Sequence, residues 1–258
     1  MTKIYTTEIT SESLPSDNPI HQRLFKAYVA AEEYIHGKVL EIGCGEGRGV
    51  ELLIQKADSF TAVDKIEGAL QKLRARFPQA TFIAMNLPPL TGLPDNAFDC
   101  VVSFQVIEHI KNDRLFLQEI YRVLKPGGLA LLTTPNRKMS LTRNPWHVRE
   151  YLADELTALA ASVFRQVDMK GITGNEKVMA YYEQNRQSVN RITRWDKLDL
   201  QHKLPAWMLR IPYELLNRLN RNNLQQANQH LVTNISHTDY LVTDRAGEAL
   251  DLFIIVRK

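Results

Sequence analysis

The sequence predicts an α/β fold with one doubly wound, mostly parallel sheet of seven strands and a helical cap inserted before the last strand. Short apolar runs typical of strands alternate with segments of helical periodicity through the first two-thirds of the chain, as in βαβ units. A glycine-rich turn stands between the first strand and the next helix. The alternation stops at about residue 172, where a mostly helical segment rich in Asn, Gln and Arg begins.

Strands are expected at seven short runs that are rich in apolar residues. In chain order, these are residues 38–42, 59–63, 81–85, 98–104, 129–134, 163–171 and 249–256. Helices are expected where apolar residues recur at helical spacing. These segments are residues 20–36, 48–57, 66–77, 113–124 and 151–161. The Lys125-Pro126-Gly127-Gly128 sequence ends the helix before it, because its glycines can take positive φ angles just before the next strand.

This pattern divides the chain into four parts. An N-terminal arm and helix occupy residues 1–36, and a ligand-binding core occupies residues 37–171. Residues 172–248 form a helical cap that covers the active site, and residues 249–258 return to the sheet as its last strand. The first 20 residues are polar and lack a clear period, so we expect a flexible arm or a lid there.

Composition predicts a cytoplasmic protein with one substantial core. The chain has 258 residues, 44% of them hydrophobic, and no apolar run approaches the roughly 18 residues that span a bilayer. Its N-terminus lacks the basic start and apolar run of a signal peptide. Cys44 lies in the glycine turn and Cys100 in an expected buried strand, so a disulfide framework is not suggested and a reducing compartment fits.

The glycine turn, Gly43-Cys44-Gly45-Glu46-Gly47, predicts a ligand site. Glycines at alternate positions let the backbone turn tightly and approach a ligand with no Cβ in the way. A dinucleotide fingerprint would need a third glycine at Arg48 or Val50, so a nicotinamide dehydrogenase is disfavoured. Glu41 would repel a pyrophosphate but suits a ligand with an ammonium group, such as S-adenosylmethionine.

Two further positions fit a nucleoside. Asp64 ends the second strand 23 residues after Glu41, close to the offset at which an acid meets a ribose diol in this topology. An Asp at a strand end can instead cap the next helix, and both readings stay open. After the third strand, the side chain of Asn86 can donate and accept hydrogen bonds to adenine.

From Val39 to about Asn136 the chain resembles class I S-adenosylmethionine-dependent methyltransferases, which have a Rossmann-like fold. Besides Asp64, the motifs are E-x-G-x-G-x-G at 41–47, L-P-D-x-x-F-D at 93–99 and R-V-L-K-P-G-G at 122–128. The resemblance implies S-adenosylmethionine as cofactor and S-adenosylhomocysteine as product. The cofactor-binding residues that it implies are Glu41, Gly43, Cys44, Gly45, Gly47, Asp64, Lys65, Asn86, Leu87 and Gln105. The family more often has Asp at the adenine position, so Asn86 makes this site less negative.

Gln105, Glu108 and His109 end the fourth strand, in the segment that lies under the methionine part of the cofactor in the proteins it resembles. The pattern is similar to the E-x-x-E-H of ubiquinone-pathway O-methyltransferases and small-RNA 2′-O-methyltransferases, some of which bind a divalent metal. Gln105 replaces the first Glu, so one anionic ligand is missing and we expect no metal. Glu108 and His109 can instead belong to a helix N-cap region and the packed core.

His147 and His109 are the candidate catalytic residues. His147 stands in Asn144-Pro145-Trp146-His147-Val148-Arg149-Glu150-Tyr151, after the fifth strand, and loops at the carboxyl ends of strands form the ligand crevice in such sheets. An imidazole can remove a proton from a hydroxyl acceptor near neutral pH. The alternative is that His147 hydrogen-bonds the loop and fixes its shape.

The cap carries a local excess of positive charge. Between residues 181 and 230 there are eight lysines and arginines but four acids, whereas the whole chain has a net charge of +3. Within 207–219 an apolar stripe of Met208, Ile211, Leu215 and Leu219 is expected to pack into the core or against another domain. The alternative is a basic, aromatic-bearing cap that receives an acidic, lipid-like or nucleic-acid substrate.

The sequence therefore favours an enzyme that methylates a small or medium-sized molecule by in-line displacement, at oxygen before carbon or nitrogen. Two alternatives stay open. The basic cap and the Glu-His pair would suit an RNA methyltransferase, although a nucleic-acid partner is not favoured because no continuous basic tract exists. The chain could also be a non-catalytic module that binds S-adenosylmethionine.

Overall fold

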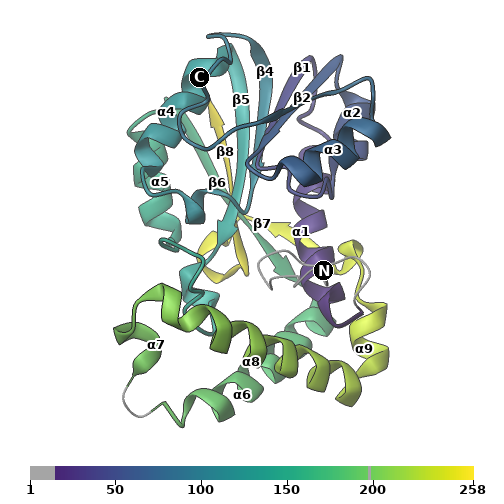
Figure 1. Cartoon of the computed structure of the whole chain (residues 1–258), viewed down its shortest axis with the longest axis vertical. Coiled ribbons are helices and arrows are strands. Elements are labelled where there is room, and N and C mark those ends of the chain that lie inside the picture. The colour runs from purple at the N-terminus through teal and green to yellow at the C-terminus, as the bar shows by residue number, and fades with distance from the viewer. Residues whose placement is uncertain (1–14, 197–198) are drawn as a thin grey trace.

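The structure is a computed structural model, and it describes residues 15–196 and 199–258. Within those residues an eight-stranded sheet forms the centre, in the order β3-β2-β1-β4-β5-β8-β6-β7 (Figure 1). The strands β1 to β5 are parallel, and β8, β6 and β7 each pair antiparallel with the strand before them in that order. The bounds are β1 Lys38–Ile42, β2 Ser59–Asp64, β3 Thr81–Ala84, β4 Phe98–Phe104, β5 Leu124–Pro135, β6 Gln166–Gly174, β7 Tyr240–Thr243 and β8 Asp251–Arg257.

The predicted α/β class and the doubly wound, mostly parallel sheet are confirmed, but the sheet has eight strands instead of seven among the described residues. The additional strand, β7, lies in the segment expected to be helical. It has four residues, pairs with the end of β6, and exposes Leu241 and Val242 at the sheet edge. A short edge strand of this kind has no clear alternation of buried and exposed residues, so its pairing partner decides its conformation.

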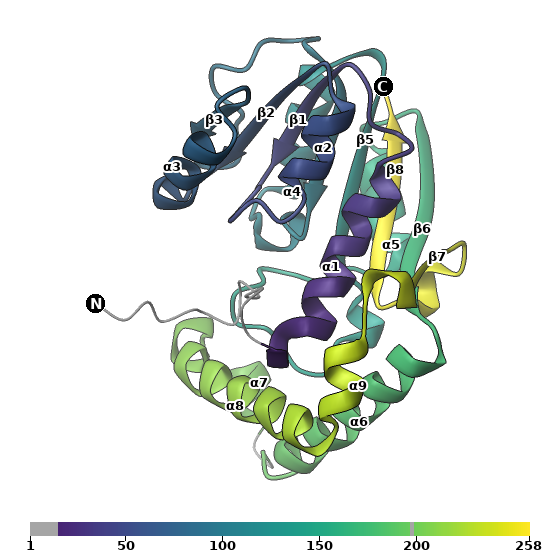
Figure 2. The same cartoon turned by 90° about the vertical axis from the view of Figure 1, so that its right-hand side faces the viewer.

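The helices cover both faces of the sheet and one of its ends (Figures 1 and 2). Their bounds are α1 Asn18–Ala31, α2 Val50–Lys56, α3 Glu67–Arg76, α4 Asp113–Val123, α5 Ala153–Ala161, α6 Glu176–Thr193, α7 Leu200–Lys203, α8 Ala206–Ala227 and α9 Gln229–Asn234. The helices α1, α2 and α3 contribute to one apolar cluster, and α4 and α5 contribute to the other. Successive strand residues alternate between them: Val39 joins the first cluster and Leu40 the second. None of the described helices has the length and apolar composition needed to cross a membrane.

The helices α6 to α9 lie together at the carboxyl end of the parallel strands, where α1 joins them to the sheet (Figure 2). The buried Asp17, just before α1, accepts hydrogen bonds from Arg218 and Arg221 of α8 at 2.8 and 3.1 Å. Asn18 donates to the carbonyl oxygens of Val232 and Ile235, both at 2.8 Å. The expected N-terminal arm falls mainly on residues 1–14, which lie outside the described residues.

The apolar stripe of α8 does not pack into the core, contrary to expectation. Met208, Ile211, Leu215 and Leu219 are 44%, 72%, 61% and 59% exposed. The buried face of α8 instead carries Asn220 and Leu224, and Arg218 and Arg221 turn toward Asp17. Hydrophobic periodicity identified the helix correctly but not the face that packs, because a helix with apolar residues on more than one side has more than one face that can be buried.

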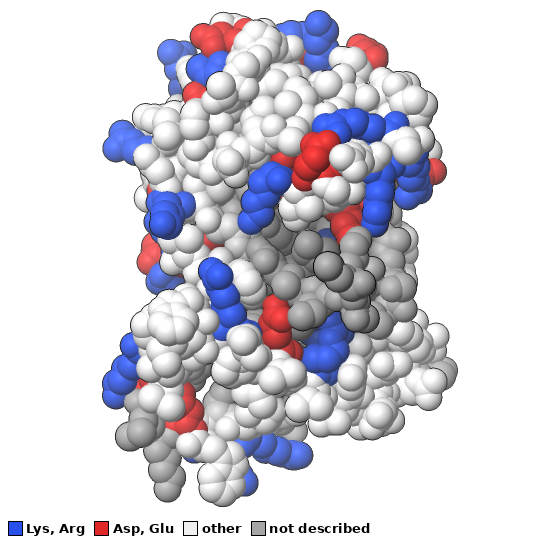
Figure 3. Space-filling view, viewed as in Figure 1, with Lys and Arg blue, Asp and Glu red and all other residues white. Residues whose placement is uncertain are grey.

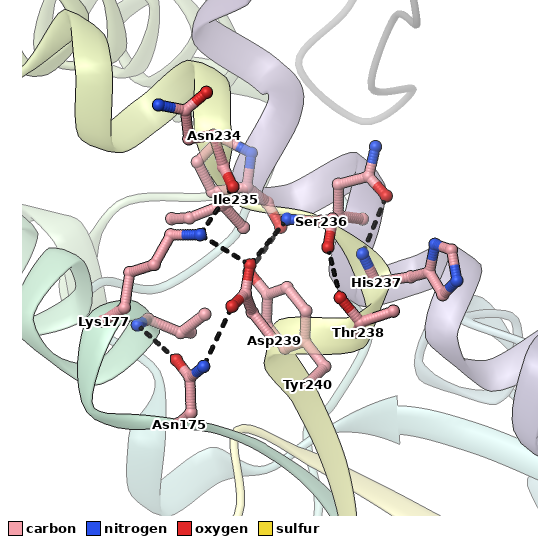
Figure 4. Close-up of polar contacts among 12 residues, drawn as sticks. Asn175, Lys177, Asn234, Ile235, Ser236, His237, Thr238, Asp239 and Tyr240 are labelled. Carbon is pink, nitrogen blue, oxygen red and sulfur yellow. Dashed lines mark hydrogen bonds and ion pairs between the residues drawn. The ribbon is translucent and has the colours of Figure 1, made fainter.

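The chain returns from the cap to the sheet through a polar junction around Asp239 (Figure 4). The Asp239 carboxylate accepts hydrogen bonds from Lys177 at 2.7 Å, from Asn175 Nδ2 at 2.9 Å and from the Ser236 amide at 2.9 Å. The hydrogen bond from Lys177 is the largest cause that lowers the pKa of Asp239 to about 2. Tyr240 starts β7 and donates to the Pro19 carbonyl oxygen at 2.6 Å. The start of α6, the end of α9 and α1 therefore meet at one point.

Candidate active site

The strand order reverses between β1 and β4, and ligands bind at the carboxyl ends of the strands at such a point. The glycine turn follows β1 there. Gly43, Gly45 and Gly47 have φ angles of 80°, 53° and 85°, in the left-handed region that favours glycine. A Cβ added to Gly43 or Gly47 would clash with a neighbouring side chain, whereas one added to Gly45 would meet nothing within 4 Å. The backbone at Gly45 is therefore open to a ligand.

Glu41 is buried beside this turn, with 1% of its surface exposed. Its Oε1 accepts a hydrogen bond from Tyr28 of α1 at 2.8 Å, while Oε2 is buried without a hydrogen-bond partner. Burial raises the pKa of Glu41 to about 7. A buried carboxylate oxygen without a partner is costly, and a ligand ammonium group would satisfy it. The residues present therefore fit the cationic cofactor that the sequence predicts.

Asp64 links the glycine turn to the next helix. Its Oδ2 accepts from the Gly45 amide at 2.8 Å and its Oδ1 from the Ile66 amide, which precedes α3, at 2.9 Å. Each carboxylate oxygen can accept a second hydrogen bond, so the helix contact leaves capacity for ribose hydroxyls. Lys65 and Asn86 are exposed and Leu87 is half-buried. The Met85 amide donates to the Asp64 carbonyl oxygen at 2.9 Å, which keeps the ends of β2 and β3 adjacent.

Gln105 bends the chain away from β4. Its φ angle is 58°, its amide donates to the Thr133 carbonyl oxygen at 2.9 Å, and its Nε2 donates to Thr133 Oγ1 at 3.3 Å. This strained turn directs its side chain toward a pocket between the sheet and the cap. Gln105 thus lies on the side of His109 and His147, which line the same pocket.

That pocket has a volume of about 250 Å³ and is closed by residues of four regions of the chain. We call it the acceptor pocket. The loops after β4 and β5 contribute Glu108, His109, His147 and Glu150, and the cap contributes Tyr181, Tyr213 and Arg221. Helix α1 contributes Arg23, which forms an ion pair with the buried Asp251 of β8 at 3.1 Å. The two candidate catalytic histidines therefore share one polar pocket.

Backbone contacts bring the histidines together. The Glu108 carbonyl oxygen accepts hydrogen bonds from the amides of Val148 and Arg149 at 2.8 and 3.3 Å, which joins the loop after β5 to the turn after β4. His109 Nδ1 lies 3.0 Å from the Trp146 carbonyl oxygen, to which it donates. The rings of His109 and His147 meet edge to face with centroids 5.0 Å apart. Burial lowers the pKa of His109 to about 4, so its ring is neutral at pH 7.

His147 has a defined tautomer. Asn144 Oδ1 accepts from the Trp146 amide at 3.0 Å, which directs Asn144 Nδ2 to His147 Nε2 at 2.8 Å. Because Nδ2 is a donor, Nε2 carries the lone pair and Nδ1 carries the proton. Nδ1 donates to Glu150 Oε1 at 2.6 Å, and Ser140 donates to the other oxygen of Glu150. Glu150 thus holds the ring with its basic nitrogen defined.

Glu108, His109 and His147 each place one ligand atom within 4.8 Å of the others, close enough to hold a metal ion. Glu108 is buried, accepts from Thr134 Oγ1 at 3.0 Å, and has a pKa raised to about 7 by its burial. Both ring nitrogens of His147 already bond to protein groups. The expectation of no metal therefore stays a prediction.

Three side chains of this site, Tyr28, Glu150 and Arg23, belong to none of the motifs found in the sequence. Glu150 could have been found, because a carboxylate three residues after a histidine can reach its ring in a tight loop. Tyr28 and Arg23 come from α1 and reach β1 and β8 across the fold, so no local pattern indicates them. The carboxyl ends of the five parallel strands β1 to β5, and the segments that follow them, supply the residues that the sequence predicts.

Known proteins share this arrangement in part. Residues 40–132 match the family of methyltransferase domains. A "probable S-adenosylmethionine-dependent methyltransferase" of Mycobacterium tuberculosis is 42% identical over 159 residues, 59% of this chain and 56% of that protein. A relative in Mycolicibacterium smegmatis with the same description is 38% identical over 169 residues, 63% of this chain and 65% of that protein. The chain thus spans less than two-thirds of the length of either relative.

Among solved structures, a methyltransferase of Thermotoga maritima described as a possible histamine N-methyltransferase superposes with a TM-score of 0.56 at 17% identity. The superposition covers 93% of this chain and 91% of that one, and at this identity it shows the fold. Fold, motifs and relatives agree on S-adenosylmethionine as the cofactor. Residues 40–132 therefore form a methyltransferase domain, and in fold, motifs and relatives the chain is similar to the class I S-adenosylmethionine-dependent methyltransferases.

Proposed function

We propose that this protein transfers the methyl group of S-adenosylmethionine to a small or medium-sized molecule, on oxygen, in the acceptor pocket. The observation that carries the proposal is the His147–Glu150 pair, whose tautomer presents a basic nitrogen at a polar pocket beside Gln105. The same proposal includes a cytoplasmic location and a small molecule as the partner.

The cofactor-binding set is proposed from the open backbone at Gly45 and the unsatisfied Oε2 of Glu41. Glu41 would hold the ammonium group, the glycine turn would approach the cofactor through its backbone, and Asp64 would accept from the ribose hydroxyls. Asn86 would meet the adenine and Gln105 the methionine part. The complete set is Glu41, Gly43, Cys44, Gly45, Gly47, Asp64, Lys65, Asn86, Leu87 and Gln105.

When bound, S-adenosylmethionine supplies a methyl carbon already activated by positive sulfur. The protein has to align the acceptor oxygen with that carbon and accept the proton that the hydroxyl loses. The cofactor would give up its methyl group and leave as a neutral sulfide, while His147 Nε2 would take the proton that the acceptor hydroxyl loses. The hydroxyl would replace Asn144 as the donor to Nε2, and Glu150 would stabilise the charged ring.

The test measures transfer of a labelled methyl group from S-adenosylmethionine to a panel of hydroxyl-bearing acceptors. His147→Ala should retain cofactor affinity but lower turnover by roughly 10²–10⁴-fold. The loss should shrink as pH rises, because a more ionised acceptor needs less help. His36→Ala is the matched control. His36 is exposed and lies just before the amino end of β1, so this variant should keep full turnover.

Three outcomes separate the alternatives. Full activity of His147→Ala at every pH would remove His147 from the mechanism and leave alignment as the catalytic device. Calorimetric binding of the cofactor without methylation of any acceptor would favour a non-catalytic binding module. Binding of NAD in preference to S-adenosylmethionine would contradict the cofactor site itself.

A further inference from the structure

The cap contains a second cavity of about 560 Å³, between α6, α7 and α8. We call it the tail cavity. Most of its lining side chains are apolar, among them Ile192, Leu204, Met208, Leu209, Pro212 and Leu216. Its volume lies within the range of about 300–1,000 Å³ that is typical of small-molecule sites. The cavity is therefore large enough for a ligand, and its surface suits an apolar one.

The two charged side chains that line the tail cavity form hydrogen bonds with backbone groups of its wall. Arg143 Nη1 donates to the carbonyl oxygens of Gln201 and Leu204, both at 3.1 Å. The Asp196 carboxylate accepts from the amides of Leu200 and Gln201 at 2.8 and 3.0 Å. These contacts hold the α7 segment against the loop after β5. Because burying an unsatisfied charge or amide is costly, such a cavity favours a ligand group without polar atoms.

The tail cavity adjoins the acceptor pocket. The residues that line both are Thr142, Val189, Tyr213, Asn217 and Asn220. Asn220 is fixed there, accepting from Ser188 Oγ at 2.6 Å and donating to Asn185 Oδ1 at 2.7 Å. The acceptor pocket, which contains the two histidines, and the apolar tail cavity thus share a wall of mainly uncharged polar side chains.

The tail cavity also reaches the surface of the cap. Trp195, Met208 and Leu200 line it and are 74%, 44% and 43% exposed. Over α8 the molecular surface is mainly uncharged, with basic and acidic side chains around it (Figure 3). Exposed apolar side chains grouped at the rim of a cavity mark a binding site for apolar groups.

We infer that the tail cavity binds the aliphatic chain of an amphipathic methyl acceptor, whose reacting polar group occupies the acceptor pocket. The inference rests on the proposed function for the identity of the ligand as an acceptor. The cavity itself is tested by binding alone, so the two can fail separately. One molecule that spans both sites would bond to the polar groups near His147 and pack against the apolar wall of the tail cavity.

The test uses calorimetry of the complete chain with 1-hexanol, 1-octanol and 1-decanol. Affinity should rise by about fourfold for each added methylene that the cavity buries. Leu216→Trp fills the cavity and should weaken 1-decanol binding at least tenfold. Leu215→Trp makes the same change at the neighbouring position, which is 61% exposed and does not line the cavity, and should leave 1-decanol affinity unchanged.

Binding of S-adenosylhomocysteine, measured in both variants, shows that each is folded, because the residues proposed to bind the cofactor lie outside the tail cavity. An affinity that does not depend on chain length, or equal losses in the two variants, would overturn the inference. If the alcohols bind as expected while no acceptor is methylated, the tail cavity stands and the proposed function fails. If acceptors without an aliphatic chain are methylated while the alcohols do not bind, the proposed function stands and the inference about the tail cavity fails.

Discussion

Among the described residues, the buried acidic side chains differ in the groups that donate hydrogen bonds to them or pair with their charge. They are Asp17, Glu41, Asp64, Glu108 and Asp251. Asp17 and Asp251 pair with arginines, and Asp64 accepts two backbone amides. Glu41 and Glu108 accept from the hydroxyls of Tyr28 and Thr134, and burial raises the pKa of both to about 7. These two carboxyls can therefore change protonation near neutral pH, and burial also raises the pKa of Asp251.

Cofactor binding should strengthen as pH rises from 5.5 to 7. The Glu41 carboxyl, whose pKa is about 7 in the free protein, must lose its proton to pair with an ammonium group. Binding then releases a proton, and mass action favours it at higher pH until Glu41 is ionised in the free protein as well. Calorimetry of S-adenosylhomocysteine in buffers of different ionisation enthalpy measures this proton.

Glu41→Gln is the control for that measurement. It should bind more weakly and remove most of the pH dependence, because glutamine does not titrate. If the wild-type affinity is flat between pH 5.5 and 7, Glu41 does not meet the ammonium group.

Asp64→Ala should weaken cofactor binding by roughly 1.5–3 kcal/mol, the range for hydrogen bonds to a charged group. The variant should stay folded, since the loss falls on a loop contact at one end of β2. Asp58→Ala, an exposed acid beside the other end of the same strand, should bind normally. Equal affinity of wild-type and folded Asp64→Ala protein would leave Asp64 with a capping role alone.

At the scale of elements, β7 and α8 show how tertiary contacts override local pattern. The strand β7 has only four residues and is held between the β6 ladder and the Asp239 junction (Figure 4). Helix α8 keeps its apolar stripe exposed because the opposite face meets α6 and the turn just before α1. In both cases the neighbouring element, rather than the segment's own sequence, determines what is buried.

Asp239→Ala should lower the free energy of unfolding by about 2 kcal/mol, because three donors lose a charged acceptor. Asp244→Ala is the matched control at the other end of β7. Its exposed ion pair with Lys170 should contribute much less to stability, because solvent screens the two charges. Urea unfolding of the three proteins at pH 7 measures both values.

The contribution of Asp239 should depend on pH in the acid range. Its pKa is about 2 in the folded protein and roughly 3.9 in an unfolded chain, so its stabilisation is complete above about pH 4. As pH falls through 2 the folded protein takes up the proton and the advantage over Asp239→Ala disappears. A difference between the two proteins that is constant from pH 5 to 2 would contradict this assignment.

At the scale of the molecule, the cap and the sheet are joined mainly through α1. Its first residues and the preceding turn contact α8, α9 and β7, while Tyr28 and Arg23 reach β1 and β8. The acceptor pocket lies between these contacts, so its shape depends on how α1 holds the cap. The buried Asp17, which both Arg218 and Arg221 contact, is the clearest link.

Asp17→Ala should loosen the cap without unfolding the sheet. Two arginines lose their carboxylate, so the free energy of local opening of α8 should fall by roughly 1–3 kcal/mol. Hydrogen exchange should therefore accelerate at α8 amides and remain slow in β1 and β4, which serve as the internal reference. Uniform acceleration throughout the chain would show instead that Asp17 stabilises the whole fold.

The sequence by itself determined the class of fold and the glycine turn at which we propose that the cofactor binds. The observed strands β1 and β4 have the predicted bounds, because buried parallel strands consist of local apolar runs that their own residues specify. The turn at 43–47 and Asp64 were found for the same reason: glycine and carboxylate at a strand end have local conformational and chemical consequences.

Tertiary structure alone decided which residues meet. Tyr28 reaches Glu41 from a separate helix, the contact of His109 with His147 depends on backbone bonds between two loops, and β7 exists because β6 offers it a partner. The tail cavity is formed by the consecutive helices α6, α7 and α8 together with the loop after β5, which is distant from them along the chain. Periodicity reports whether a side chain is buried, but the identity of its neighbour depends on how whole elements pack.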